Sequence, residues 1–361
     1  MTKTPSRIGG ENTLSPRALN RALLHRQMLL ERSALPLERV VEGMGGIQMQ
    51  YAPSGYIGLW SRVRDFERPM LTRALEDKAV IQGTLMRGTI HTVSAADYWP
   101  MLAGIRRINR EWYTQVAARE LAGIDMPAVA DAVRGLLADG PMRFAALAAA
   151  LEERGFPTRA AKAAGWWVDL VRVPPSGTWE ARRADLYGLS EGWTTPVNVA
   201  EDDGIEHLVR RYLGAFGPAA PRDIASWMGL KVGQMKQVVE RMELVAHRDE
   251  DGKPLLDLPN AMLPDPATPA PPRFIGVWEA MLLVHARRTG VLPEEHRPLV
   301  FSTKTPHSVN TFLVDGRVAG TWRHVDSEVR IEPFGRLAPA DRAAVEDEAH
   351  RLSAFHEDPA A

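Results

Sequence analysis

Two glutamines separated by one apolar residue, Gln48-Met49-Gln50, are the residues of this sequence whose spacing most directly suggests chemistry. In an extended chain, side chains two residues apart point to the same face, so the two carboxamides would lie side by side. Each carboxamide offers hydrogen-bond donors and an acceptor, and a pair of them can hold one water molecule in a fixed position. The spacing alone is also compatible with two ordinary solvated glutamines in a loop.

Two other catalytic signatures are absent from the 361 residues. The chain contains no GxxxxGK[ST] phosphate loop and no HExxH zinc motif. It has no cysteine, which excludes thiolate nucleophiles, cysteine-ligated zinc and iron–sulfur clusters. We therefore expect neither a metal nor a cofactor. The first lysine after the glutamine motif is Lys78, which argues against a Schiff-base mechanism.

The charge of the chain is unevenly distributed. The formal net charge is −1, which does not by itself indicate a nucleic-acid partner. Residues 1–40, however, carry seven basic and three acidic side chains, a net charge of +4, and residues 341–361 carry two basic and six acidic ones, a net charge of −4. Any binding of nucleic acid must therefore come from local clusters of basic residues.

The clearest structural pattern covers residues 204–258. Apolar residues from Ile205 to Phe216 recur at helical spacing, and Gly217-Pro218 follows them. Two shorter helices are expected over 221–228 and 231–243. A hairpin with its turn at Asp251-Gly252 completes the segment. Helix, short helix, helix and hairpin in this order are typical of a winged helix-turn-helix.

This pattern recurs in the sequence. Gly140-Pro141 precedes an alanine-rich helix just as Gly217-Pro218 precedes the second helix above, 77 residues later. A third, weaker copy fits 67–93, with a hairpin turning at Arg87-Gly88. We therefore expect an α+β fold, mainly helical, with about three tandem winged helix-turn-helix modules. The alternative is a helical protein in which the Gly-Pro turns coincide by chance.

The remaining segments frame these modules. Ser15-Pro16 and Pro36 mark the starts of two helices, and the glycine- and proline-broken segment 47–63 is expected to be a loop that leads into another element. Residues 259–273 are rich in proline and predict an extended strap. A hairpin turning at Asp315-Gly316 and a terminal helix over 338–355 follow. The expected divisions of the chain are 1–100, 101–200, 201–258 and 259–361.

The arginines supply candidate contacts to DNA, because winged helices place a helix or a wing on the duplex and arginine binds phosphate in a bidentate manner. For each of them a solvated charged surface is an equally good interpretation. No apolar run in the chain suits a signal peptide or a membrane span, so we expect a cytoplasmic protein. The candidate DNA-binding arginines are Arg62, Arg64, Arg87, Arg106, Arg107, Arg317 and Arg323.

The sequence resembles the AlkZ family of bacterial DNA glycosylases over nearly its whole length. The stretches that carry the resemblance are GIQMQYAPSGYIGLWSRV, LMRGTIHTVSAADYW, YLGAFGPAAPRDIASWMGL and TFLVDGRVAGTWR. In that family a Gln-apolar-Gln motif is catalytic, which identifies Gln48 and Gln50 as the catalytic pair. Glutamine at both positions is similar to the branch associated with self-resistance to the DNA-crosslinking antibiotic azinomycin B, whereas a sister branch has Asp at the second position.

The resemblance implies a C-shaped arrangement of the winged modules and a monofunctional glycosylase. Such an enzyme hydrolyses the N-glycosidic bond of N7-alkylated purines and unhooks interstrand crosslinks. Its partner is double-stranded DNA containing these lesions, with no membrane involved, and the protein is expected to act as a monomer. By the same analogy His91 and Arg323 line a DNA-facing concavity, although for His91 a role in core packing is the alternative. The competing hypothesis is a non-catalytic winged-helix DNA-binding protein or transcription regulator.

Overall fold

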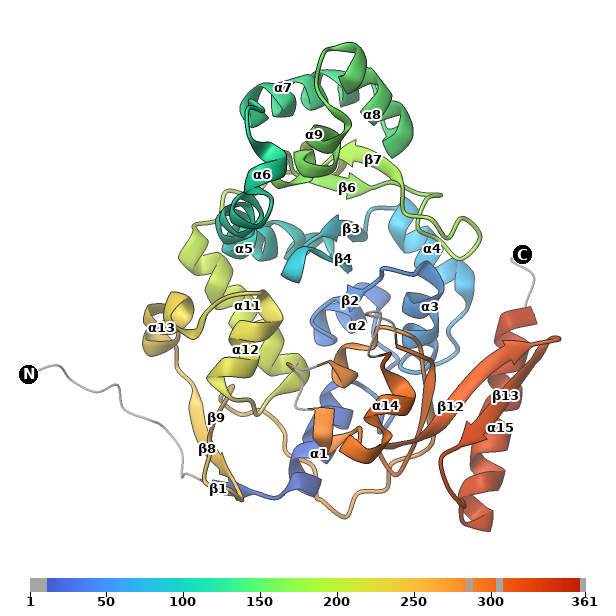
Figure 1. Ribbon diagram of the computed structural model, residues 1–361. Coiled ribbons are helices and arrows are strands. Elements are labelled where there is room, and N and C mark those ends of the chain that lie inside the picture. The colour runs from blue at the N-terminus through green and yellow to red at the C-terminus, as the bar shows by residue number, and fades with distance from the viewer. Residues whose placement is uncertain (1–11, 284, 286–287, 303–307, 358–361) are drawn as a thin grey trace, which may run out of the picture.

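The computed structural model describes residues 12–283, 285, 288–302 and 308–357. In these residues helices predominate over three small β-sheets, and winged-helix modules follow one another along the chain, so the predicted fold class is confirmed. In Figure 1 α7 (Met126–Leu137), α8 (Phe144–Glu153) and α9 (Thr158–Ala163) stand at the top, and α13 (Val232–Arg241) lies at the left. The hairpin of β12 (Arg317–Val325) and β13 (Glu328–Pro333) lies at the right with α15 (Pro339–Glu357). The predicted divisions of the chain at residues 100, 200 and 258 stay a prediction.

The first winged module contains the glutamine motif. Its two wing strands, β3 and β4, are joined by a short 3-10 turn at Met86–Gly88, where the sequence predicts a hairpin. A further short strand, β2, pairs with β4 at the edge of the sheet. The module is formed by α2 (Leu37–Gly43), β2 (Ile47–Gln48), α3 (Ala52–Trp60), α4 (Arg68–Glu76), β3 (Val80–Thr84) and β4 (Ile90–Ser94).

The expectation of a loop over 47–63 is wrong for about half of that segment, because Ala52–Trp60 form helix α3. All nine residues of α3 are buried. A helix that is surrounded on every side shows no amphipathic period, so the sequence pattern does not reveal it. Pro53 lies in the first turn, where a missing N–H costs nothing. Gly55 faces Met49 so closely that a Cβ atom there would lie 2.6 Å from the Met49 sulfur.

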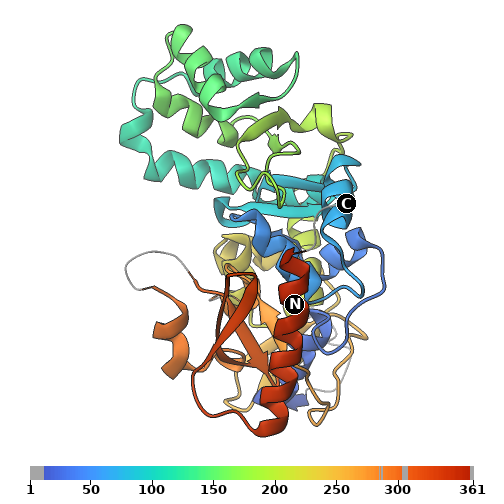
Figure 2. The same ribbon diagram turned by 90° about the vertical axis from the view of Figure 1, so that its right-hand side faces the viewer.

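The second winged module shares its sheet with the first. The order of the six strands is β2-β4-β3-β6-β7-β5, and β3 pairs with β6 through Gln82 opposite Arg172. The two wings therefore form one continuous sheet, above the middle of the molecule in Figure 2. The module is formed by α7 (Met126–Leu137), β5 (Met142–Arg143), α8 (Phe144–Glu153), α9 (Thr158–Ala163), β6 (Leu170–Arg172) and β7 (Leu186–Leu189).

The third winged module matches the sequence pattern element by element. The N-terminal strand β1 (Asn12–Leu14) pairs in parallel with its wing, and α1 (Pro16–Arg26) begins after Ser15, whose hydroxyl accepts a hydrogen bond from the Ala18 N–H at 3.2 Å. The module is formed by α11 (Glu201–Phe216), α12 (Pro221–Met228), α13 (Val232–Arg241), β8 (Val245–Asp249) and β9 (Pro254–Asp257).

The C-terminal part packs a four-stranded antiparallel sheet against a long helix. Residues 259–272 contain no helix or strand, as the prolines predict. The hairpin turns at Asp315-Gly316, as predicted, and the indole N–H of Trp322 donates to the backbone carbonyl groups of Ile275 and Thr311, both at 3.1 Å. The elements are β10 (Arg273–Ile275), the short α14 (Arg297–Val300), β11 (Thr311–Val314), β12 (Arg317–Val325), β13 (Glu328–Pro333) and α15 (Pro339–Glu357).

Helix α5 (Ala95–Val116) joins the first two modules and crosses α11 of the third at very short range. Gly104 and Gly204 meet at the crossing. A Cβ atom on Gly204 would lie 2.4 Å from the backbone nitrogen of Gly104 and 2.7 Å from the carbonyl oxygen of Pro100. Only glycine permits so close an approach of two backbones. The two glycines therefore fix how the third module sits against the first.

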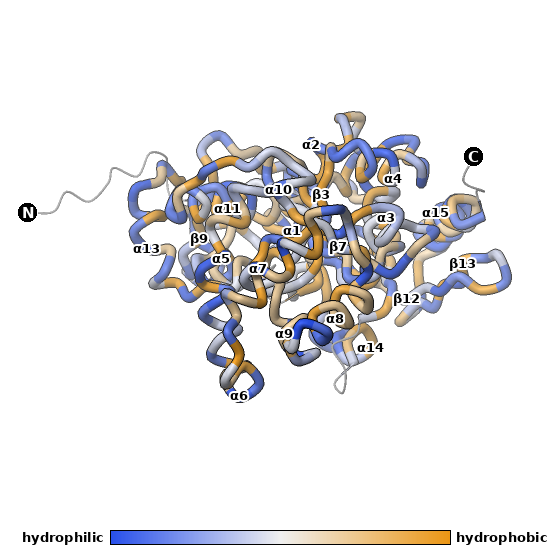
Figure 3. The backbone as a smooth tube through the Cα atoms, turned by 90° about the horizontal axis from the view of Figure 1, so that it is seen from above, coloured by the Kyte–Doolittle hydropathy of each residue, from blue (hydrophilic) through white to orange (hydrophobic). Residues whose placement is uncertain are grey.

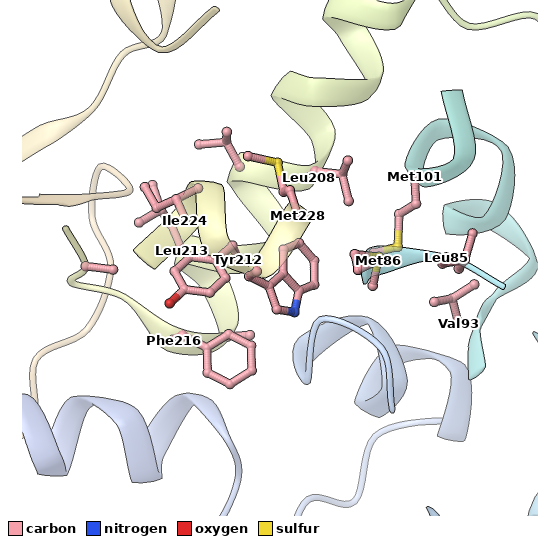
Figure 4. Close-up of a cluster of buried hydrophobic side chains, with 14 of the residues drawn as sticks. Leu85, Met86, Val93, Met101, Leu208, Tyr212, Leu213, Phe216, Ile224 and Met228 are labelled. Atoms are coloured by element: carbon pink, nitrogen blue, oxygen red, sulfur yellow. The ribbon is translucent and has the colours of Figure 1, made fainter. Parts of the chain in front are cut away.

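A single buried apolar cluster links these modules. Leu85, Met86 and Val93 of the first module belong to one cluster with side chains of α5, α11 and α12. Figure 4 shows these three residues at the right beside Met101, with Tyr212 and Phe216 at the left of the same cluster. Figure 3 colours the backbone by hydropathy. The strand β3 in the middle of the molecule is hydrophobic, whereas turns at the periphery are hydrophilic. Among the described residues, no helix combines the length and the apolar character that a membrane-spanning segment requires.

The crossing of α5 and α11 yields a stability prediction. Gly204→Ala should lower the free energy of unfolding by about 1–3 kcal/mol, because the added methyl group meets backbone atoms that cannot move aside. Gly233→Ala in α13 is the matched control, since nothing lies within 4 Å of a Cβ atom there. The control should raise stability by up to about 1 kcal/mol, as alanine favours helix over glycine. Urea unfolding of both variants checks this, and equal effects at the two positions would contradict it.

Candidate active site

Strand β2 places the first glutamine of the motif beside a histidine. β2 pairs antiparallel with β4, with Gln48 directly opposite His91. The pairing extends by one residue, because the Met49 N–H donates to the carbonyl oxygen of Ile90 at 2.8 Å. Directly opposed side chains of an antiparallel pair lie on one face of the sheet with Cβ atoms about 4.5–5.5 Å apart. The carboxamide of Gln48 and the imidazole of His91 are therefore neighbours.

The apolar residue of the motif is its anchor in the core. Met49 is 1% exposed, and its sulfur accepts hydrogen bonds from the Thr92 hydroxyl at 3.0 Å and from the Gln82 carboxamide at 3.5 Å. Because side chains alternate along an extended chain, burial of Met49 on one side turns the flanking Gln48 and Gln50 to the other.

The two carboxamides are held through their oxygens. The Gln48 side chain is buried, and its Oε1 accepts a hydrogen bond from Arg87 Nη2 at 3.0 Å. Gln50 is exposed, and its Oε1 accepts from the backbone N–H of Ile90 at 3.2 Å. Neither Nε2 group has a hydrogen-bond partner among the residues that the structure describes. These amide nitrogens, together with the second lone pairs of the two oxygens, are available to a water molecule or to a substrate.

His91 is a neutral hydrogen-bonding group. It is 2% exposed, and burial, reinforced by the positive charge of Arg87, lowers the pKa of its imidazole to about 3. Its Nδ1 lies 3.1 Å from the backbone carbonyl oxygen of Thr89, which can only accept, so Nδ1 carries the proton. The other ring nitrogen, Nε2, is then an acceptor. Such an imidazole can orient a water molecule near Gln48 but is a poor proton acceptor at neutral pH.

Arg87 connects the motif to the third module. It lies in the turn between β3 and β4 with φ of 55°, a conformation that non-glycine residues rarely adopt and that costs about 1–3 kcal/mol. Its Nη2 donates to Gln48, and its Nη1 donates to the backbone carbonyl oxygen of Trp227 at the end of α12. Burial lowers the pKa of the Arg87 guanidinium to about 10, so it stays charged at neutral pH.

Comparison with known proteins identifies the family of the chain. The family model of the DNA glycosylase AlkZ-like proteins matches residues 41–355. The chain belongs to the AlkZ-like family. A curated relative, the interstrand DNA cross-link repair glycosylase of Streptomyces sahachiroi, is 24% identical over 91% of this chain and 93% of its own length. The solved structure of the Streptomyces sahachiroi DNA glycosylase AlkZ has the same fold, with a TM-score of 0.78 and 20% identity over 95% of this chain and 97% of the other.

The family match confirms two expectations drawn from the sequence. The resemblance to AlkZ glycosylases holds, and the AlkZ-like chain is a DNA glycosylase, an enzyme that hydrolyses N-glycosyl bonds. The residue roles stay predictions, because the match does not assign them. What the structure adds is that Gln48, Gln50, Arg87 and His91, four of the residues singled out from sequence, lie together at one edge of the first module.

Arg62 requires a correction, because the sequence predicts it as a DNA contact. Its side chain has no exposed surface. Its guanidinium donates to Glu279 at 3.0 Å, to the carbonyl oxygen of Gly58 at 3.0 Å and to the Gln27 carboxamide at 3.2 Å. A buried guanidinium with three partners is part of the core and has no surface to offer a phosphate. The prediction that Arg62 contacts DNA is therefore wrong.

Apart from Arg87, the side chains of the other predicted DNA-binding arginines make no hydrogen bond to Gln48 or Gln50 among the described residues. Four of them make ion pairs with carboxylates: Arg64 with Glu31, Arg106 with Asp169, Arg107 with Glu111 and Glu201, and Arg323 with Glu332. Arg317 is exposed and has no ion-pair partner in the described part of the chain. Contact of these five residues with DNA stays a prediction, and for four of them a phosphate would have to compete with an existing carboxylate.

His285 is a residue near the site that sequence reasoning missed. It is 2% exposed, both its ring nitrogens lack hydrogen-bond partners within the described residues, and its ring packs edge-on against Tyr212 and Phe216. Burial lowers its pKa well below the usual value, and the charge of Arg87 adds to this. No local motif surrounds His285 in the sequence that would mark it. No three His, Asp or Glu side chains among the described residues are grouped so as to hold a metal ion.

The neutral histidine predicts a pH dependence of stability. The pKa of His91 is about 3 in the folded state against an ordinary value of 6.5, so the unfolded chain binds more protons between these values. The free energy of unfolding should therefore fall as the pH is lowered from 6.5 toward 3, with His91 contributing up to about 1.4 kcal/mol per pH unit. Urea unfolding at pH 6, 5 and 4 should show a slope that is smaller by about 1 kcal/mol per pH unit in His91→Gln.

The exposed His350 provides the matched control for this experiment. His350→Gln should leave the slope of the parent protein unchanged. An identical slope in the parent and in His91→Gln would show that His91 is protonated in the folded state at these pH values.

Proposed function

We propose that this AlkZ-like glycosylase excises N7-alkylated purines from double-stranded DNA, and that Gln48 and Gln50 hold the attacking water. The observation that carries the proposal is the geometry of the two carboxamides. Each oxygen is fixed by a donor on the β3–β4 hairpin, while each Nε2 has no partner among the described residues. Amides held in this way are preorganised to orient a water molecule.

Neutral amides suit a cationic leaving group. Alkylation at N7 places a positive charge on the purine, so when the C1′–N9 bond breaks, the electron pair neutralises the base without any protonation. The water oxygen then bonds to C1′, and its proton passes to solvent. A site that holds water between carboxamides and a neutral imidazole such as His91 lacks a strong base, so neutral lesions should react slowly.

The lysine positions support hydrolysis by water without an amine nucleophile. The ammonium group of Lys78, the first lysine after the motif, lies 4.4 Å from the centre of the Trp193 ring, where it makes a cation–π contact. A glycosylase that uses water releases the base and leaves the DNA backbone intact, which is the monofunctional reaction proposed here.

The substrate class proposed for this chain includes interstrand crosslinks. The curated relative is named for interstrand crosslink repair and is matched over 93% of its length. We propose that this chain likewise unhooks crosslinks formed through N7 of purines, of the azinomycin B type, and so protects its host from such an antibiotic. A base tied to both strands resists extrusion from the duplex, so an open site at an exposed residue such as Gln50 is an advantage. Action as a cytoplasmic monomer belongs to the same proposal.

Excision from defined duplexes tests the proposal. Gln48→Ala and Gln50→Ala should each slow the release of N7-methylguanine by about 10²-fold in single-turnover reactions, because a water that is no longer oriented loses its positional advantage. Gln115→Ala, at an exposed glutamine of α5, is the matched control and should react like the parent protein. Release is followed by chromatography of the free base, with thermal unfolding measured in parallel.

Two outcomes would contradict the proposal. The first is undiminished release by both glutamine variants when their thermal stability equals that of the parent. The second is release of a neutral lesion such as hypoxanthine at a rate close to that of N7-methylguanine. The same assay decides against a non-catalytic DNA-binding protein as soon as the parent protein releases the base, and a duplex joined by one N7-to-N7 crosslink extends it to unhooking.

A further inference from the structure

A small cavity lies between β2, α3 and residues 277–280, directly beside Gln48. Its volume is about 20 Å³, which is enough for one water molecule. The polar side chains among its lining residues belong to Gln27, Gln48, Ser54 and Glu279. A buried water needs about two to four polar partners, and this lining can supply them. A single water molecule in the cavity can therefore bridge the Glu279 carboxylate and Gln48.

One oxygen of the Glu279 carboxylate accepts hydrogen bonds, and the other accepts none from the described residues. Its side chain is 8% exposed, and Oε1 accepts hydrogen bonds from Arg62 Nη2 at 3.0 Å and from the Met281 N–H at 3.4 Å. No donor within the described residues reaches Oε2. An ionised carboxylate accepts at both oxygens, so Oε2 is available to a water molecule.

The segment that carries Glu279 is strained into place. Trp278 has φ of 63°, which for so large a side chain costs about 1–3 kcal/mol. Such strain persists only where the surroundings enforce it, and here Gly276 packs so closely on α3 that a Cβ atom there would lie 3.3 Å from Ser54 Cα. The Arg62 guanidinium, which has no exposed surface, donates to Oε1 of Glu279 and so fixes this carboxylate. The buried charges are costly to assemble, so packing alone gives no reason for them.

We propose that Glu279 is a positioning residue for Gln48 and acts through a single water molecule in this cavity. The water donates to Glu279 Oε2 and accepts from Gln48 Nε2, while Arg87 holds Gln48 Oε1 on the other side. The carboxamide then cannot flip, and its oxygen keeps a lone pair directed at the attacking water. This inference rests on the proposed catalytic role of Gln48.

Glu279→Gln tests the inference with little change of shape. The oxygen of the new carboxamide still accepts hydrogen bonds from Arg62 and Met281. An NH₂ group, which donates hydrogen bonds, replaces the acceptor Oε2, so the water molecule meets donors both there and at Gln48 Nε2. The single-turnover rate of N7-methylguanine release at saturating protein should fall by about 10²-fold, because a small misplacement of a positioning group costs that much. The protein concentration that gives half of the maximal rate should change less than about threefold, since DNA contacts are untouched and that shift is under 1 kcal/mol.

A second buried carboxylate provides the matched control. Glu348 on α15 is 2% exposed and pairs with Arg32 at 2.6 Å, Arg351 at 2.9 Å and Arg273 at 3.6 Å, and it does not line the cavity. Glu348→Gln removes one buried charge in the same way and should leave the excision rate unchanged. Equal slowing in both variants would show that the effect is general loss of stability and would overturn the inference.

A cavity-filling variant keeps the inference testable if Glu279→Gln does not fold. Gly58 lines the cavity, and a Cβ atom there would meet only Arg62 Nη1 within 4 Å, at an ordinary 3.6 Å. Gly58→Ala should therefore fold, displace the water and slow release. Full activity of either folded variant overturns the role of Glu279 while loss of activity in Gln48→Ala still upholds the proposed function. Full activity in both Gln48→Ala and Gln50→Ala overturns the proposed function itself.

Discussion

Strand β2 is only two residues long, too short to hold an extended shape alone, and its pairing with β4 is the contact on which the candidate site depends. That pairing sets Gln48 opposite His91, turns Met49 into the core and leaves Gln50 at the surface. A shift of one residue would exchange these faces and bury the wrong side chains. The short strand is thus fixed by the burial of Met49 as much as by its backbone hydrogen bonds.

The side chains around this pairing are either neutral or have their charges engaged in hydrogen bonds and ion pairs. His91 is neutral, the amides are neutral, and the charge of Arg87 is used in hydrogen bonds to Gln48 and to the backbone of α12. Glu279 and Arg62 form a buried ion pair whose opposite charges compensate each other. Under the proposed function, such a site suits a substrate that brings its own positive charge and that gains little from acid–base chemistry. The link from Arg87 to α12 also means that the third module stabilises a site on the first.

The sequence predicted most where signals are local. The helices and hairpin of the third module, the turn at Asp315-Gly316 and the helix after Ser15 follow from periodicity, turn residues and capping, which need no knowledge of distant partners. Helix α3 was missed because its burial on all sides removes the amphipathic pattern. Arg62 was misassigned because an arginine beside an aromatic residue looks alike in sequence whether it is exposed or buried. The sheet that joins two modules through β3 and β6 depends on non-local register, which the sequence does not encode locally.

The pH dependence of the chemical step decides whether water held by neutral amides performs the reaction. The measurement is the single-turnover rate of N7-methylguanine release at saturating protein between pH 6 and 9. Gln48 and Gln50 do not titrate, and the pKa of His91, about 3, lies far below this range. The rate should therefore stay constant within about twofold, well under the tenfold change per pH unit that an essential titrating group produces. A rate that changes tenfold per pH unit would reveal a titrating acid or base in the reaction and would contradict this mechanism.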